Sequence, residues 1–145
     1  RPDGGTEALM PTPTVQCHAA NLAFLPNGDL ACVWFGGTQE GVSDISVHLS
    51  RLRAGTDQWL DPVQLSFDSS RSEQNPILFN APNGDVWLLY TGQIAANQDS
   101  SIVRRRVSHD GGETWDAVKG PRLPSGRDLA ALDERGRGGR GIQDP

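Results

Sequence analysis

Short runs of apolar residues, separated by polar and glycine-rich segments, predict β-strands in the first half of this chain. Residues 30–35 are almost wholly apolar, which is typical of a strand covered on both faces. Residues 45–50 alternate between apolar and polar side chains, so we expect one buried face there and His48 on the outward face. Shorter runs at 19–25 and 62–65 complete a set of four strands.

The same order recurs in the second half of the chain. The tetrapeptide PNGD occupies residues 26–29 and again 82–85, and Trp59 and Trp115 are separated by the same 56 positions. A period of this size is typical of a propeller or a solenoid. Asn-Gly between apolar segments is a strong hairpin signal, and we expect a type I′ turn at each copy. Strands of the second copy are predicted at 77–79, 86–90 and 102–107.

Four short antiparallel strands per repeat, used twice, predict an all-β fold made of about two propeller blades. We divide the chain into an irregular lead-in (1–16), a first blade (17–66) and a second blade (73–123). Residues 124–145 contain few apolar side chains, so we expect a disordered tail there.

Composition narrows the classes of partner. The chain has 145 residues and a formal net charge of −5, and it has no apolar run long enough to cross a bilayer. We therefore expect neither nucleic acid nor a membrane as partner. No signal peptide is visible, and the compartment is left open. The cysteines, Cys17 and Cys32, are predicted to be unpaired, one of them a small core residue. No residue spacing suggests a metal site, and no cofactor is predicted.

A second motif lies near the end of the second copy. Residues 108–115 read SHDGGETW, in which Asp110 can accept hydrogen bonds from the amides of its own turn. Gly112 supplies a turn conformation, and Trp115 buries a large ring beside it. The segment matches the S-x-D-x-G-x-T-W "Asp box" of bacterial neuraminidase repeat (BNR) proteins, in which Ser108, Asp110, Gly112 and Trp115 would have a structural role. In the first copy only Ser50 and Trp59 remain, at what reads as a longer spacing.

The resemblance extends over roughly residues 13–115. The segment HAANLAFLPNGDLACVWFGGTQEGVSDISVHLSR, residues 18–51, resembles the first blade of the sialidase-like BNR group. That group has six blades, so the resemblance implies an incomplete fragment of a sialidase-type propeller. It also implies an exo-α-sialidase-type glycoside hydrolase that acts on a glycan or glycoconjugate.

The connections of the strands place the candidate chemistry at one end of the blades. Because each strand reverses direction, the start of the first strand and the loop 36–44 share one end, while the PNGD turns and the Asp box share the other. The candidate catalytic residues at the first end are His18, Glu40 and Asp44, and the candidate substrate-binding residues are Gln74, Asn75 and Gln93. An imidazole, carboxylates and amides suit a sugar site.

Two positions carry the comparison with sialidases. Asp44 matches the family's acid/base aspartate, with Glu40 as the reserve candidate, although Asp44 could also close its loop by bonding backbone amides. His18 stands where the family has the arginine of an Arg-Ile-Pro motif, and a histidine cannot reproduce the guanidinium fork. Propellers that cleave rhamnose-glucuronate linkages, as lyases or hydrolases, rely on histidine, so His18 could instead act as acid or base. A rim histidine that bonds a loop carbonyl remains an alternative.

The remaining aromatic and basic residues indicate structure. Trp34, Phe35 and Tyr90 lie in the most apolar strands and are predicted to be core residues. Residues 104–106 are three consecutive arginines that alternate between faces. Two blades alone would leave open sheet edges, so we also consider a non-catalytic carbohydrate-binding or assembly module. We expect this segment by itself to lack hydrolase activity and to self-associate.

Overall fold

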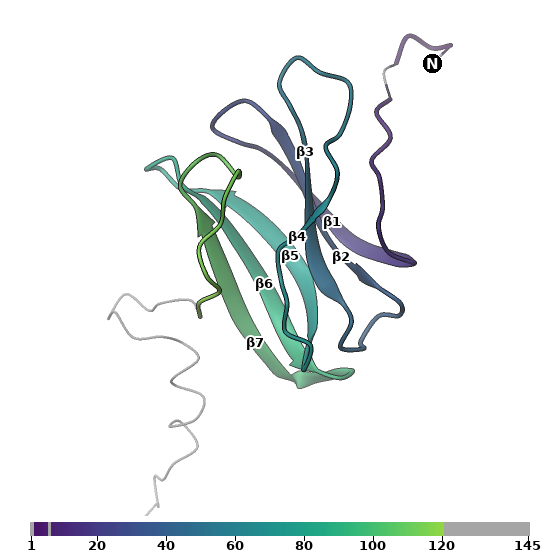
Figure 1. Cartoon of the computed structure of the whole chain (residues 1–145), viewed down its shortest axis with the longest axis vertical. Helices are drawn as coiled ribbons and strands as arrows, with labels where there is room; N and C mark the ends of the chain where they lie inside the picture. Colours follow the sequence, from purple (N-terminus) through teal and green to yellow (C-terminus); the bar gives the residue numbers. More distant parts are fainter. Residues whose placement is uncertain (1, 6, 121–145) are drawn as a thin grey trace, which may run out of the picture.

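The computed structural model describes residues 2–5 and 7–120, which form two antiparallel sheets that pack face to face (Figure 1). The first sheet has the order β1-β2-β3-β4, with β1 (Gln16–Phe24), β2 (Leu30–Gly37), β3 (Ser46–Leu52) and β4 (Val63–Gln64). The second has the order β5-β6-β7, with β5 (Ser72–Asn80), β6 (Val86–Ile94) and β7 (Asn97–Ser108). The described residues contain no helix, so the predicted all-β class is confirmed. The predicted tail, 124–145, lies outside the described residues.

The two sheets repeat one another at an offset of 56 residues in their strand pairing. In the first sheet Trp34 lies opposite His48, and in the second Tyr90 lies opposite Arg104. The inner strands share an irregularity as well. A bulge follows His18 in β1 and Gln74 in β5. The period predicted from the PNGD and tryptophan positions is therefore a period of the backbone.

The repeat extends to the fourth, outer strand. Leu49 pairs with Val63 of β4, and 56 residues later Arg105 forms a bridge with Lys119. The second blade thus has a strand-like contact where the first has β4, although the described residues form only a three-stranded second sheet. The assignment of 73–123 as one blade stays a prediction.

The PNGD hairpins differ from the predicted type I′ turn. Gly28 has φ 90° and Gly84 has φ 89°, but neither asparagine has positive φ. The Gly28 N–H donates to the Leu25 carbonyl at 2.9 Å, which places Pro26 and Asn27 at the centre of the turn. Pro26 explains the difference, because its ring fixes a negative φ at a central position, and a type I′ turn needs positive φ at both central residues. The glycine then follows in the left-handed region, as in a three-residue hairpin with a bulge.

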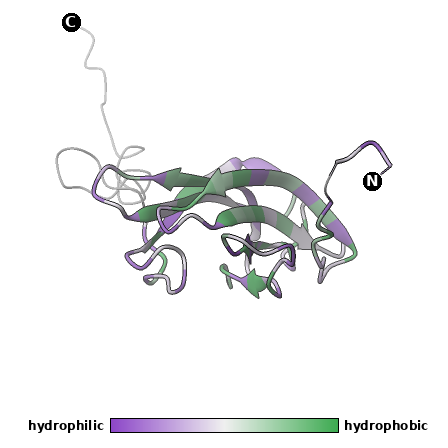
Figure 2. Cartoon of the chain, turned by 90° about the horizontal axis from the view of Figure 1, so that it is seen from above, coloured by the Kyte–Doolittle hydropathy of each residue, from purple (hydrophilic) through white to green (hydrophobic). Residues whose placement is uncertain are grey.

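Each sheet has two faces, which we call front and back. The front carries Val33 in the first sheet and Leu89 in the second, and the front of the first sheet packs against the back of the second. Figure 2 shows the hydrophobic residues along the strands, with more hydrophilic loops. The core between the sheets contains Leu25, Ala31, Val33, Val47, Leu49, Leu65, Leu78, Val86, Leu88 and Tyr90.

The prediction for His48 was wrong. His48 is only 6% exposed, and its ring stacks on Trp34 with centroids 5.8 Å apart. The back of the first sheet is covered here because the lead-in runs along it, with residues 13–15 lining a cavity together with His48 and Gln64. Burial lowers the pKa of His48. An alternating pattern therefore did not indicate a solvated face, since a segment outside the sheet covers the polar positions.

Other predictions about packing are confirmed. Trp34, Phe35 and Tyr90 are 1–2% exposed. Both cysteines are free, and Cys32 is the buried one. The arginines alternate, because Arg104 ion-pairs on the back of the second sheet while the Arg105 guanidinium lies over Trp87 on the front, 4.8 Å from the ring centroid. No helix that could span a membrane occurs among residues 2–5 and 7–120.

Candidate functional site

The loops 38–44 and 94–97 meet at one end of the two sheets, the lower end in Figure 1, which we call the rim. The Ala96 N–H donates to the Gly41 carbonyl at 2.8 Å, and a Cβ on Gly41 would lie 3.4 Å from that of Ala96. The opposite end carries the PNGD turns and the Asp box, and we call it the turn end. The predicted separation of the loops between two ends is therefore confirmed.

Asp44 lies exposed on the rim and closes the loop that precedes it. Both of its carboxylate oxygens lie 3.3 Å from the Thr38 amide, which donates to them. The second repeat makes the same bond with a different side chain, because the Ile94 amide donates to the Ser100 hydroxyl at 2.7 Å, each residue 56 positions further on. The loop-capping role considered from the sequence is thus present. A hydroxyl serves for loop closure in the other repeat, so this bond does not require a carboxylate.

The other catalytic candidates lie at the same end of the first sheet. His18 is exposed and pairs with Phe35 in the neighbouring strand, where the two rings stack with centroids 5.4 Å apart. His18 and Asp44 line different cavities, one beneath Met10 and Thr12 and one beside Ser46. The Glu40 amide donates to the Gln16 side chain at 3.1 Å, which ties the loop to the start of β1. The structure places these candidates on the rim without bringing His18 and Asp44 into one cavity.

The three predicted substrate-binding amides differ in exposure. Gln74 is 5% exposed and donates to the Ser72 hydroxyl at 2.9 Å. Gln93 is 6% exposed and accepts from Ser101 at 3.4 Å. Asn75, at φ 53° in the β5 bulge, is the exposed member of the group. Their role in substrate binding stays a prediction.

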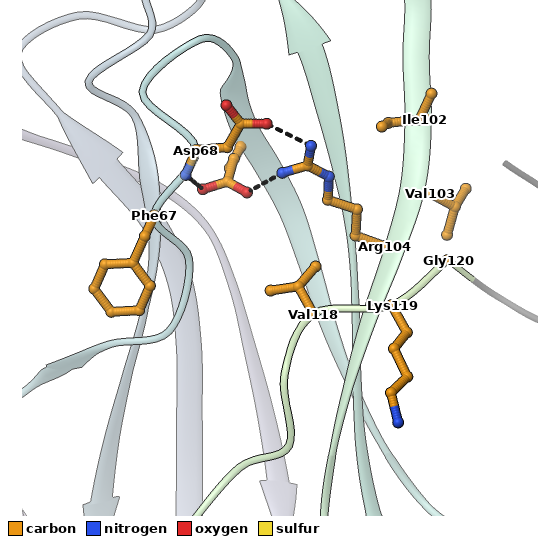
Figure 3. A pocket seen from close by; sticks show the side chains of 9 residues that line it. Phe67, Asp68, Ile102, Val103, Arg104, Val118, Lys119 and Gly120 are labelled. Atoms are coloured by element: carbon orange, nitrogen blue, oxygen red, sulfur yellow. Dashed lines mark hydrogen bonds and ion pairs between the residues drawn. The ribbon is translucent and has the colours of Figure 1, made fainter.

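An ion-pair cluster, Asp68, Glu73 and Arg104, lies beside the rim and was missed from the sequence (Figure 3). Glu73 is 1% exposed, and its carboxylate accepts from the Arg104 guanidinium at 2.8 Å and from the Asp68 amide at 3.1 Å. Arg104 also pairs with the Asp68 carboxylate. The available signal was the predicted alternation of residues 104–106, because an arginine that alternation directs toward a core needs an acidic partner.

The cluster holds the Asp68 carboxylate in the ionised form. A hydrogen bond from the Ser70 hydroxyl, with further contributions from Arg104, lowers the pKa of Asp68 to about 2. Asp68 therefore cannot supply a proton near neutral pH. It can accept hydrogen bonds, position the connection between the blades and contribute negative charge.

Two cavities meet at this cluster. One of about 200 Å³ is lined by Asp44, Asp68 and Glu73 together with four serines, Ser43, Ser46, Ser66 and Ser69. A neighbouring cavity of about 480 Å³ shares Asp68, Glu73 and the exposed Phe67, and it adds Arg104 and apolar residues of β7 (Figure 3). Carboxylates and hydroxyls beside an aromatic ring can bind a polyhydroxylated ligand through hydrogen bonds and its C–H faces. Among residues 2–5 and 7–120, no group of three or more metal-ligating side chains is found.

The Asp box forms a hydrogen-bonded turn at the turn end. Asp110 accepts from the amides of Glu113 and Thr114 at 3.0 and 2.9 Å, and it also bonds the Ser108 hydroxyl at 2.7 Å. The box also joins the blades, because Glu113 forms two 2.6 Å hydrogen bonds with Arg51 of the first blade.

The relation between the box and the first repeat differs from the prediction. Residues 52–59 match residues 108–115 without a gap, so Leu52, rather than Ser50, stands at the position of Ser108. Ser50 instead donates to the Leu60 carbonyl at 2.6 Å. The predicted longer spacing was wrong because it took the nearest serine as the counterpart. Gly55, at φ 78°, repeats Gly111, at φ 72°.

Comparisons with known proteins agree with this architecture. The BNR repeat-like domain family matches residues 28–133. Similar solved structures include a Hadza microbial sialidase, Hz136, with a TM-score of 0.60 at 12% identity, covering 72% of this chain and 26% of that protein. A protein of unknown function from Dyadobacter fermentans DSM 18053 has a TM-score of 0.61 at 13% identity, with 81% and 40% covered.

An α-L-arabinanase of Penicillium chrysogenum, solved with arabinobiose, has a TM-score of 0.54 at 19% identity, covering 79% of this chain and 36% of that protein. The chain thus spans between about a quarter and two fifths of these solved proteins. No curated protein matches the chain. The chain shares the fold of these structures and forms part of a propeller. The match over residues 28–133, together with the repeated blade, shows that the chain belongs to the BNR repeat-like domain family.

Proposed function

We propose that the rim binds a glycan as part of a sialidase-like glycoside hydrolase in which Asp44 donates the proton. The observation that carries this proposal is the cavity that joins the exposed Asp44 of the first blade to Asp68 and Glu73. Glycosidases need one carboxyl group to protonate the departing oxygen, and a second group to stabilise or attack the anomeric carbon. We assign only the first of these roles.

The neighbouring proteins support carbohydrate as the ligand class. One is named a sialidase, and another is an α-L-arabinanase solved with arabinobiose. Within the proposed site Asp68 and Glu73 are positioning groups, because Arg104 holds both carboxylates. Their remaining lone pairs, with the four serine hydroxyls of the cavity, would accept and donate hydrogen bonds to sugar hydroxyls.

A histidine-dependent reaction on a rhamnose-glucuronate linkage is the second candidate. The observation in its favour is His18, whose exposed ring is oriented by Phe35 at the position where sialidases have an arginine. A histidine can transfer a proton, whereas it lacks the bidentate fork that holds a sialic acid carboxylate.

The second repeat suggests a variant that separates the chemistry of Asp44 from its structural role. Asp44→Ser replaces the carboxylate by the side chain that closes the equivalent loop at Ser100. We expect this variant to fold, to keep the Thr38 amide protected from hydrogen exchange, and to bind the glycan about tenfold more weakly, because it loses a hydrogen bond to a charged group. Asp57→Asn, an exposed carboxylate in the loop 53–58 at the turn end, is the matched control and should change nothing.

Binding is measured by titrating the ¹⁵N-labelled chain with sialyllactose, arabinobiose and a rhamnose-glucuronate disaccharide. Amide shifts at residues 38–44 and 67–75 with one of these sugars would support the proposal, and the sugar that binds would choose between the candidates. Shifts confined to the Asp box, or no shift with any of the sugars, would contradict it.

Turnover is a separate measurement. In the sialidases that this chain resembles, the Tyr/Glu nucleophile pair comes from late blades, so we expect the 145-residue chain to bind without hydrolysing fluorogenic glycosides. A monodisperse, monomeric preparation of the chain that turns over a fluorogenic sialoside would refute that expectation.

A further inference from the structure

The front of the second sheet presents large apolar side chains to solvent. Ile77 and Phe79 on β5 are each 54% exposed, and Val103 on β7 is 46% exposed. All three lie on the face that carries Leu89, which is the face away from the first sheet.

The repeat shows what this face corresponds to. Subtracting 56 from Ile77 and Phe79 gives Asn21 and Ala23, which lie on the front of the first sheet and face the second. There Ala23 packs on the core that contains Leu78, and the Asn21 side chain accepts from the Leu78 amide at 3.0 Å. The exposed front of the second sheet is therefore equivalent to the front of the first sheet, which packs against the second sheet inside the chain.

The complementary surface is present as well. Inside the chain, the back of the second sheet supplies Leu78, which is 8% exposed. Its counterpart on the back of the first sheet is Leu22, which is 60% exposed, and Phe24 beside it on the same face is 70% exposed. The contact between the two blades joins the front of one sheet to the back of the other. The described residues present both kinds of surface once more, a front on the second sheet and a back on the first, and these two exposed surfaces lie on opposite sides of the molecule.

We propose that a second copy of this chain docks head to tail, so that Leu22 and Phe24 of one copy pack on Ile77 and Phe79 of the next. The contact repeats the internal packing of the first sheet on the second. Because the two surfaces differ, the interface is heterologous. Each added copy leaves one front and one back free, so association continues until a ring closes or a filament grows.

The structure also limits the strength of this contact. The lead-in covers part of the back of the first sheet, where Met10 and Thr12 line a cavity with Trp34, so the docking surface is confined to the part nearer the turn end. Ile77 replaces Asn21 and cannot reproduce its hydrogen bond to the neighbouring blade. A small apolar contact of this kind predicts association in the micromolar range.

Sedimentation velocity on the full 145-residue chain tests the proposal between about 1 and 200 µM, a range suited to a weak interface. We expect the weight-average mass to rise with concentration. Phe24→Glu and Phe79→Glu each place a charge in the contact and should weaken association at least tenfold. Both positions are exposed, so both variants should keep the circular dichroism spectrum of the unmodified chain. Leu9→Glu is the control, because Leu9 is 91% exposed on the lead-in and outside the contact.

Mixing the two variants distinguishes a head-to-tail contact from a symmetric one. Phe24→Glu retains an intact front and Phe79→Glu an intact back, so the mixture should form a dimer that grows no further. The proposal is overturned if the unmodified chain is a monomer throughout, if Leu9→Glu weakens association as much as the other variants, if either variant associates normally, or if the mixture stays monomeric.

Discussion

The two blades share one backbone and differ in what their side chains do with it. Both have the same strand pairing, the same bulge in the inner strand and the same turn around a left-handed glycine. On the back face, however, the first blade has Trp34 beside His48, while the second has Tyr90 beside Arg104. Turn and bulge geometry therefore defines the frame, and equivalent positions within the frame are free to carry local chemistry.

The rim illustrates this division. Ser100 closes its loop with a hydroxyl, whereas Asp44 closes the equivalent loop with a carboxylate that also lines a polar cavity. At the turn end the difference is reversed. The second blade has a full Asp box, while the first has Ala54 in place of Asp110. There the carboxylate comes from Asp29, which accepts from the Ala54 amide at 3.0 Å.

The largest expected effect concerns the buried ion pair of Glu73 and Arg104, whose equivalent positions in the first blade are Cys17 and His48. Glu73→Gln leaves the Arg104 guanidinium without its buried partner, and we expect a loss of about 3 kcal/mol in the free energy of unfolding. Urea unfolding followed by tryptophan fluorescence measures the loss. The exposed Glu40 provides the control, and Glu40→Gln should be neutral. A loss below about 0.5 kcal/mol for Glu73→Gln would mean that the buried pair does not stabilise the folded chain.

The next effect compares two leucines at the same repeat position. Leu78 is packed between the sheets and Leu22 is exposed. Leu78→Ala should cost about 2–3 kcal/mol because it leaves a cavity, while Leu22→Ala should cost less than about 0.5 kcal/mol. The same urea titration, carried out at low protein concentration, gives both numbers. Equal losses would contradict the assignment of one internal and one free face.

Acid should destabilise the chain through aspartates of the second blade and of the connection that leads into it. The Ser70 hydroxyl, with Arg104, lowers the pKa of Asp68 to about 2, and the Thr114 hydroxyl and amide lower that of Asp110 further. A folded-state pKa below the unfolded value stabilises the folded state above the unfolded pKa, and this stability is lost as the pH falls. The free energy of unfolding should therefore decrease between about pH 4 and pH 2. Asp68→Asn should flatten this decrease, and an unchanged slope would contradict the assignment.

The smallest effect is a difference between two histidines. The hydrogen bond between the His109 ring and the Asp85 carboxylate, which accepts it, raises the pKa of His109 above its ordinary value, while burial lowers that of His48. An NMR titration of the ring protons should separate the two, with His109 titrating at higher pH. Asp85→Asn should move only His109, back toward its ordinary pKa. The interpretation fails if the order of the two histidines is reversed.

Features that depend on interactions between residues close in the sequence could be predicted, whereas features that depend on distant segments could not. The period of 56, the blade pattern and the Asp box could be predicted because they depend on turn residues and local hydrogen bonds. The buried position of His48 could not, since a segment outside the sheet covers it. The Asp68, Glu73 and Arg104 cluster was missed for a similar reason, as its members are up to 36 residues apart and the first blade has no matching group. The roles of His18 and Asp44 remain predictions.

The most direct test of the repeated blade and its two distinct ends is a ¹⁵N-edited NOESY spectrum of the folded chain. We predict contacts between Gly41 and Ala96 at the rim and between Asn27 and Gly111 at the turn end, with the pairing of Leu49 and Val63 repeated by Arg105 and Lys119. Contacts between the 38–44 loop and the Asp box, or strand pairings whose offset differs from 56, would contradict the account.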